Sequence, residues 1–327
     1  MNFLKLIFNF FNDLKKIKKN ILIKNSESTY QIMRYLYLLS DGLLLDLISK
    51  FLDSAAKPSS KFGTGYIKFN KNNIREIDEI KENILKMKLA NKEVKNEKIK
   101  LDNEKNIHFE YYKKKSLVRL DIMPYDLLKS VIVSKFVLKD CWIEQAKKIL
   151  GTTPYMVGIN AWITLPPPEK IYSYDDIKQY VSSQMWHRDC DKLRDLKIMT
   201  YLTDVKSENE GPFEYIDNSH CFNFFNPFRY SSSMRIKNDY IQKKYKKKIS
   251  TFTGNAGTSF IVDTRGIHRG KTITKKNYFR LMLEIYISNN QFGKNKSYPA
   301  PAKDWQSYDL WTQNLKTKPN YKFLFNN

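Results

Sequence analysis

The spacing of hydrophobic positions changes along the chain at about residue 155. Before that point apolar residues recur every three or four positions. In the stretch 72–88 one face of an expected helix carries Ile74, Ile77, Ile80 and Ile84. Another helical region runs to "AKKILG", where Gly151 is a suitable stop because glycine favours the backbone conformation that ends a helix. We therefore expect the first half of the chain to be mainly helical.

The first part of this helical half reads as a separate extension. Residues 1–56 are predicted to be an N-terminal helical extension, 55–63 a linker, and 62–327 the main domain, with a Lys/Glu/Asn-rich solvated helix or loose loop at 91–107. The first helix is amphipathic and basic, so it could contact a membrane surface peripherally. We expect it to pack on the body of the protein instead. No apolar run approaches the roughly 18 residues that span a bilayer.

After residue 155 the pattern becomes that of β-strands. The stretches "GINAWITL", "KIMTYL" and "TSFIVD" are expected strands, and a short strand, "GYIKF", precedes the helices. The clearest alternation is "FRLMLEIYI" at 279–287, whose apolar face starts at Phe279 and whose other face carries Arg280, Met282, Glu284 and Tyr286. Helices followed by strands predict a mainly β domain, a barrel or sandwich with flanking helices.

Charge and cysteine content limit the choice of partner and compartment. The 57 Lys+Arg against 34 Asp+Glu give a net charge of +23, which favours an anionic partner such as nucleic acid, a membrane surface or a phosphorylated substrate. An AT-rich genome supplies many Lys, Asn and Ile codons and is an equally simple cause. The 3 cysteines form no C-x-x-C pair, so neither a disulfide framework nor a thiolate zinc site is indicated, and a reducing cytoplasm fits.

A candidate metal site begins in "QMWHRDCD". In an extended segment His187 and Asp189 project from the same face and can reach one cation. H-x-D is a weak signal alone, so a third ligand is needed, and the chain has only 4 histidines. His108 lies in a charged region where a solvated role is expected, and His220 ends "GPFEYIDNSH". His268 follows an expected strand and a glycine-containing turn, which makes it the best third ligand.

Arg280 fits the same chemistry. Two histidines and one carboxylate on one face of a metal leave three positions open, as in non-haem Fe(II) oxygenases. In those enzymes 2-oxoglutarate takes two positions and dioxygen the third, and an arginine can hold its distal carboxylate through two hydrogen bonds. A buried arginine in a strand needs a partner. Glu284, four residues further on the same face, is the alternative partner.

These motifs together resemble the phytanoyl-CoA dioxygenase-like family of Fe(II)/2-oxoglutarate oxygenases. The resemblance covers roughly residues 62–290 and includes "MWHRDCDKLRDLKIMTYLTDVKSENEGPFEYIDNSH" and "GTSFIVDTRGIHRG". It implies a double-stranded β-helix, the jelly-roll or cupin-like core, with helices outside one sheet. It also implies that iron is bound by His187, Asp189 and His268, and that Arg280 binds the 2-oxoglutarate carboxylate.

Two positions depart from the family pattern. Many relatives carry a hydroxyl residue two positions after the distal histidine, where this chain has Gly270, and Thr272 or Thr274 could supply that hydroxyl. Arg280 also follows His268 by twelve rather than eleven residues, which implies a bulge or a longer turn. Related halogenases lack the metal-binding carboxylate so that chloride can bind. Because Asp189 is present, the resemblance implies hydroxylation.

The substrate is left open by the sequence. An insert at about 222–250, rich in aromatics and lysines, sits where this fold often has a lid. It could recognise a small anionic or carrier-linked metabolite, or be a solvated basic loop. A basic nucleic-acid-associated protein, whether a binder or a demethylase, is not favoured, because no RNA-binding aromatic motif or zinc finger is visible and the second arginine of nucleic-acid demethylases falls at Tyr286 here. The other alternative is a non-catalytic jelly-roll binding protein. The presence of all three expected ligand types argues against it.

Overall fold

The computed structural model describes residues 63–69, 74–102, 107–151, 153–167, 182–189, 195–220, 235–289 and 298–325. The predicted helical extension at 1–56, nearly all of the linker and the first part of the 222–250 insert lie outside these residues. None of the helices in the described ranges combines the length and the apolar character that crossing a bilayer demands.

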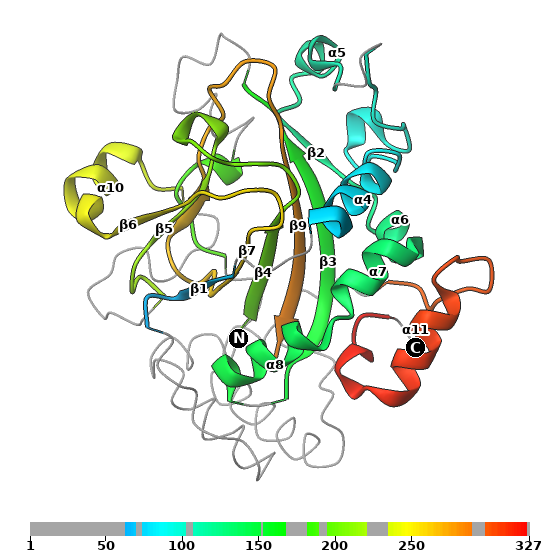
Figure 1. Cartoon of the computed structure of the whole chain (residues 1–327). Coiled ribbons are helices and arrows are strands. Elements are labelled where there is room, and N and C mark those ends of the chain that lie inside the picture. Colours follow the sequence, from blue (N-terminus) through cyan, green and yellow to red (C-terminus); the bar gives the residue numbers. More distant parts are fainter. Residues whose placement is uncertain are drawn as a thin grey trace, which may run out of the picture.

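Two antiparallel sheets form the centre of the protein (Figure 1). The larger has the strand order β1-β7-β4-β9-β3-β2, with bounds Tyr66–Phe69, Ser259–Val262, Asp195–Tyr201, Arg280–Ser288, Tyr155–Thr164 and Arg119–Asp121, respectively. The smaller has the order β6-β5-β8, with bounds Ile249–Phe252, Phe213–Ile216 and His268–Gly270. Strands far apart in sequence thus pair with one another, as in a double-stranded β-helix. The predicted mainly β fold with flanking helices is confirmed.

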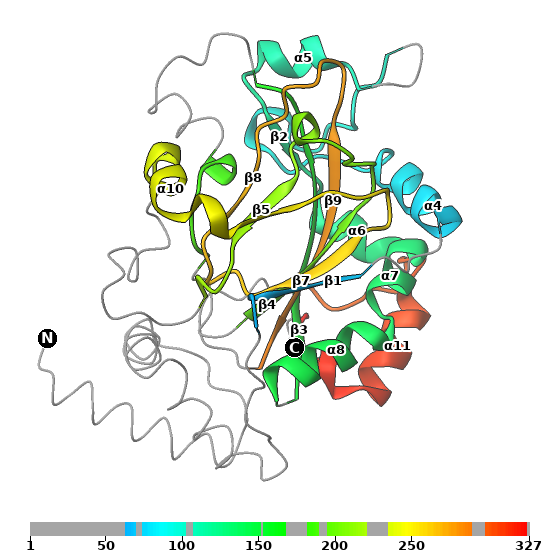
Figure 2. The ribbon, with the colours of Figure 1, turned by 60° about the vertical axis from the view of Figure 1, so that its left-hand side comes forward.

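Helices cover one face of the larger sheet and the smaller sheet covers the other (Figure 2). The helices on the first side are α4, α6, α7, α8 and α11, with bounds Ile74–Ile84, Pro124–Lys129, Val131–Val137, Asp140–Leu150 and Tyr308–Thr317. Helix α5 spans Phe109–Lys114, and α10, Asn238–Tyr245, lies beside the smaller sheet. As predicted, α8 ends at Gly151, which has a left-handed φ of 69° and donates its N–H to Lys147 O.

Strand β9 separates the two hydrophobic cores because its side chains alternate between the two faces of the sheet. The core shared with the helices receives Leu281, Leu283, Ile285 and Ile287. The core between the sheets receives Met282, packed with Phe213 and Phe260 among others. Each fully buried side chain of this size contributes roughly 1.5–3 kcal/mol, so a register slip that reversed β9 would cost many times that amount. This alternation directs the polar residues of β9 between the sheets.

Candidate metal centre and its pocket

The two histidines of the candidate site lie opposite each other on neighbouring strands. His187 N donates to His268 O at 3.0 Å, and His268 N donates to His187 O at 2.9 Å. Strand β8 pairs on its other side with β5, where Tyr215 is the partner of His268. The segment of His187 therefore extends the smaller sheet beyond β8, and the centroids of the two imidazole rings are 4.4 Å apart.

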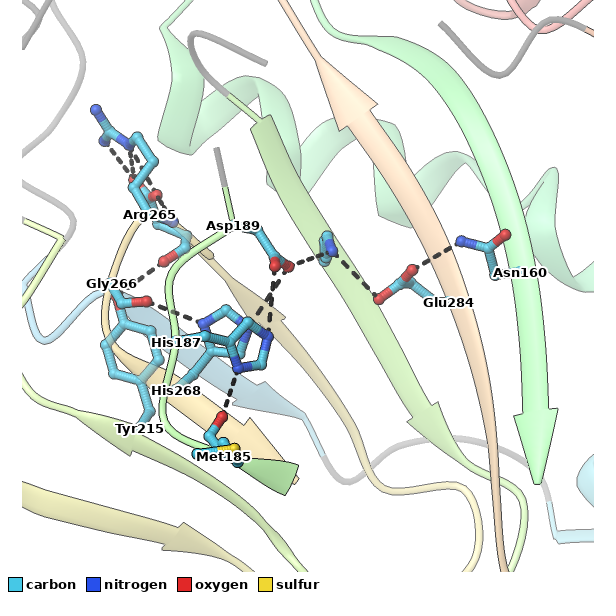
Figure 3. A network of polar contacts seen from close by, with 11 residues as sticks. Asn160, Met185, His187, Asp189, Tyr215, Arg265, Gly266, His268 and Glu284 are labelled. Carbon is cyan, nitrogen blue, oxygen red and sulfur yellow. Dashed lines mark hydrogen bonds and ion pairs between the residues drawn. The ribbon is translucent and has the colours of Figure 1, made fainter. Parts of the chain in front are cut away.

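Backbone carbonyls orient both imidazole rings. His187 Nδ1 is 2.7 Å from Met185 O, and His268 Nδ1 is 2.9 Å from Gly266 O. A carbonyl can only accept, so each Nδ1 carries a proton, which leaves Nε2 as the ring nitrogen that could bind a metal. Both Nε2 atoms face Asp189, at 3.4 Å from Oδ1 for His187 and 3.5 Å from Oδ2 for His268 (Figure 3).

The three side chains form a group that could hold a metal ion. One ligand atom from each of His187, Asp189 and His268 lies within 4.8 Å of the others. Burial, followed by the neighbouring His187, lowers the pKa of His268, which favours the neutral form that binds metals. Burial alone would raise the pKa of Asp189, but Lys197 and His268 outweigh it and hold the pKa well below its usual range. The donor set is thus two imidazole nitrogens and one carboxylate, which suits a first-row transition metal.

A buried lysine adjoins this group. Lys197 Nζ is 2.5 Å from Asp189 Oδ2 and 3.9 Å from Glu284 Oε2. Glu284 Oε1 in turn accepts from Asn160 Nδ2 at 3.0 Å. Figure 3 shows Asp189, Glu284 and Asn160 along this line of contacts, which crosses the neighbouring strands β4, β9 and β3. Lys197 was not among the site residues expected from the sequence, although it is two residues from the inward-facing Met199 on the same strand and so shares its face.

Arg280 is buried and only partly satisfied. Its side chain points between the sheets, the residue is 3 % exposed, and its Nη2 donates to Thr164 Oγ1 at 3.2 Å. Its Nε and Nη1 are buried with no hydrogen-bond partner among the described residues. Glu284, the alternative partner considered from the sequence, bonds Asn160 instead. Burial lowers the pKa of Arg280, but a guanidinium stays charged in proteins, so two donors of a buried cation remain available.

Gly270 leaves room for this guanidinium. A Cβ at Gly270 would lie 2.6 Å from Arg280 Nη2, closer than real Cβ atoms approach. A hydroxyl does reach the guanidinium from another strand, that of Thr164, which is the register partner of Arg280 on β3. Thr272 and Thr274 follow β8 in a loop, where the Thr274 hydroxyl donates to Asn209 Oδ1 at 3.0 Å. No hydrogen bond of the described residues joins Thr272 to Arg280.

The metal-binding group and Arg280 share one cavity. Its volume is about 270 Å³, near the lower end of the roughly 300–1,000 Å³ of ligand pockets. His187, Asp189, His268 and Arg280 all line it, with Met282 among the residues of its apolar wall. A small dicarboxylate could therefore contact a metal and the guanidinium together.

The remaining histidines lie elsewhere. His108 is exposed and its side chain accepts from Tyr111 N at the start of α5. His220 is buried next to Gly65, and burial together with nearby Arg188 lowers its pKa to about 4. Neither belongs to the group formed by His187, Asp189 and His268.

The fold and the site together define a double-stranded β-helix with a candidate 2-His-1-carboxylate centre. No family model and no curated protein matches the chain, so the resemblance to the phytanoyl-CoA dioxygenase-like family remains a prediction.

Among solved structures, HygX from Streptomyces hygroscopicus with nickel and 2-oxoglutarate bound is 13 % identical, with a TM-score of 0.45 over 75 % of this chain and 90 % of that one. The non-heme α-ketoglutarate-dependent carbocyclase SnoK from nogalamycin biosynthesis is 13 % identical, with a TM-score of 0.44 over 69 % and 79 %. The epimerase SnoN from the same biosynthesis is 12 % identical, with a TM-score of 0.42 over 69 % and 79 %. These likenesses are too remote to assign a reaction to this chain.

Proposed function

We propose that the protein is a non-haem Fe(II)- and 2-oxoglutarate-dependent dioxygenase that hydroxylates a small molecule. The observation that carries the proposal is the pairing, in one cavity, of the group His187, Asp189 and His268 with the half-satisfied guanidinium of Arg280. A buried cation with two unused donors needs an anionic ligand. A metal-chelating dicarboxylate meets both requirements at once.

The residues fit the cofactor by donor type and by charge. Two neutral imidazoles and one carboxylate suit Fe(II) and leave positions for 2-oxoglutarate and dioxygen. Bound iron would supply the oxidative chemistry, with 2-oxoglutarate as the co-reductant. Arg280 would bind the far carboxylate of the cosubstrate, with Thr164 fixing its guanidinium and Gly270 leaving the space it occupies. Apolar neighbours such as Phe213 and Met282 would keep water away from the reacting atoms.

Hydroxylation and a negatively charged substrate are the finer parts of the proposal. Asp189 fills the position that a halide would need, which favours hydroxylation over halogenation. Arg119 and Arg235 also line the cavity. These two cations favour an anionic small molecule. In the described part of the insert, Ile236 pairs with Trp186, the residue before His187, so this part of the insert lies beside the site.

The direct test is to follow cosubstrate binding and turnover. Anaerobic protein with Fe(II) should bind 2-oxoglutarate and give the visible charge-transfer absorption of an iron–2-oxoacid chelate. In air, with metabolite fractions selected by anion exchange, it should form succinate and a product heavier by one oxygen atom. If Fe(II)-loaded protein shows no spectral change with 2-oxoglutarate, the proposed function is wrong.

Thr164→Val tests the hydroxyl that orients Arg280. Valine keeps the shape of threonine but removes the oxygen that accepts from Nη2. We expect 2-oxoglutarate to bind about fivefold more weakly, which corresponds to the roughly 1 kcal/mol of one hydrogen bond. Calorimetric titration of the Mn(II)-loaded protein measures the change. Thr272→Val and Thr274→Val are matched controls and should bind 2-oxoglutarate as the wild type does. If either control loses more affinity for 2-oxoglutarate than Thr164→Val, that threonine and not Thr164 orients Arg280.

A further inference from the structure

Lys197 has no part in the proposed reaction, although its ammonium is the charged group closest to Asp189. The side chain is 6 % exposed and lies on β4, between the two sheets. We propose that Lys197 is a positioning residue that limits Asp189 to one metal-binding oxygen and thereby keeps three coordination positions open. This inference rests on the proposed function, since it concerns how the same site would hold its metal.

The lysine distinguishes the two oxygens of Asp189. Each oxygen faces one histidine, Oδ1 at 3.4 Å from His187 Nε2 and Oδ2 at 3.5 Å from His268 Nε2, but Lys197 Nζ lies 2.5 Å from Oδ2. A carboxylate can bind a metal through one oxygen or both. A charge-assisted hydrogen bond on Oδ2 favours the first mode, because chelation through both oxygens would bring the divalent cation close to the ammonium.

The number of open positions decides whether the site can work. With two imidazoles and one carboxylate oxygen, an octahedral metal keeps three positions. A chelating carboxylate would leave two, and 2-oxoglutarate would occupy both. Dioxygen would then have no position, so the hydrogen bond from Lys197 separates a working site from a blocked one.

Its surroundings hold Lys197 in this position. Its Nζ lies 4.2 Å from the centroid of the Tyr286 ring and 3.9 Å from Glu284 Oε2, while Glu284 is itself fixed by Asn160. A lysine serving only to neutralise Glu284 would be expected to lie nearer to that carboxylate than to Asp189. The observed order of distances is the reverse, 2.5 Å against 3.9 Å.

The experiment counts metal-bound waters in the Mn(II)-loaded protein by water-proton relaxation. We expect about three exchangeable waters in the wild type and about two in Lys197→Met, because the carboxylate then chelates. Mn(II) should also bind about tenfold more tightly to the variant, since the nearby positive charge is gone. Saturating 2-oxoglutarate should leave about one water in the wild type and none in the variant. Lys197→Arg, which keeps the charge and the donor, should restore the wild-type count.

Controls separate this inference from the proposed function and from misfolding. If Lys197→Met does not fold, the metal-bound waters are counted in Lys197→Met/Glu284→Gln instead. The second change removes the buried negative charge of Glu284, which would otherwise be left without the nearby ammonium. A wild type that binds no Mn(II) overturns the proposed function as well as the role of Lys197. A wild type with three waters and a variant with the same count and affinity overturns only the role of Lys197.

Discussion

Arg280→Leu should abolish tight binding of 2-oxoglutarate while leaving metal binding almost unchanged. The guanidinium is buried, and two of its donor nitrogens have no partner among the described residues. Removing one partner of a buried charge pair costs roughly 2–4 kcal/mol, which is about a 30- to 1,000-fold loss of affinity. The metal-binding group is made by other strands, so it should survive. Isothermal titration of the Mn(II)-loaded variant with 2-oxoglutarate measures the loss.

The matched control is Arg75→Leu, which makes the same chemical change on a side chain that is 88 % exposed on α4. It should bind 2-oxoglutarate as the wild type does. If Arg280→Leu also binds it with wild-type affinity, Arg280 does not hold the cosubstrate and the assignment fails.

His187→Ala should reduce the affinity for Mn(II) or Fe(II) on the order of a hundredfold or more. The variant leaves a metal with only two protein ligands. In known metal sites, changing a residue that merely hydrogen-bonds to a ligand already lowers the metal affinity or activity 10- to 100-fold. The wild type at a metal concentration of about 100 Kd should gain roughly 2.7 kcal/mol of stability, seen as a rise in Tm. The variant should show no such rise under the same conditions.

His108→Ala is the control for this change, because His108 is exposed and lies outside the metal-binding group. Its Tm should rise with metal as in the wild type. A metal-dependent rise in His187→Ala equal to that of the wild type would show that the ion binds elsewhere on the chain.

The long strands could be predicted from sequence because each contains enough residues to display a period. The alternation across β9 gave the inward direction of Arg280 and the apolar layer beneath the helices. The smaller sheet could not be found in the same way. β8 has 3 residues and one of them is glycine, while all 4 residues of β5 are buried, so neither shows a two-residue pattern. The histidine on β8 was found through its chemistry.

Two residues of the site depend on strand register, which is a non-local property. Thr164 reaches Arg280 because β3 pairs with β9 in the register that sets these residues opposite each other. Lys197 lies on β4, a strand that begins after Asp189 in the sequence, and it reaches that carboxylate only in the folded protein. A lysine in a strand is ordinarily assigned to the solvent face.

The stretch at 91–107 was expected to be solvated, yet Val94 and Ile99 are buried.

The mutual backbone pairing of His187 and His268 has a consequence for the dynamics of the protein. Each amide N–H of this pair is bonded to the carbonyl of the other residue. Local opening of the two strands would therefore separate both imidazoles, and an ion held between them would oppose that opening. Deuterium uptake at these two amides should slow as ion binding becomes stronger, so amide exchange would report the occupancy of the site without any change to the protein.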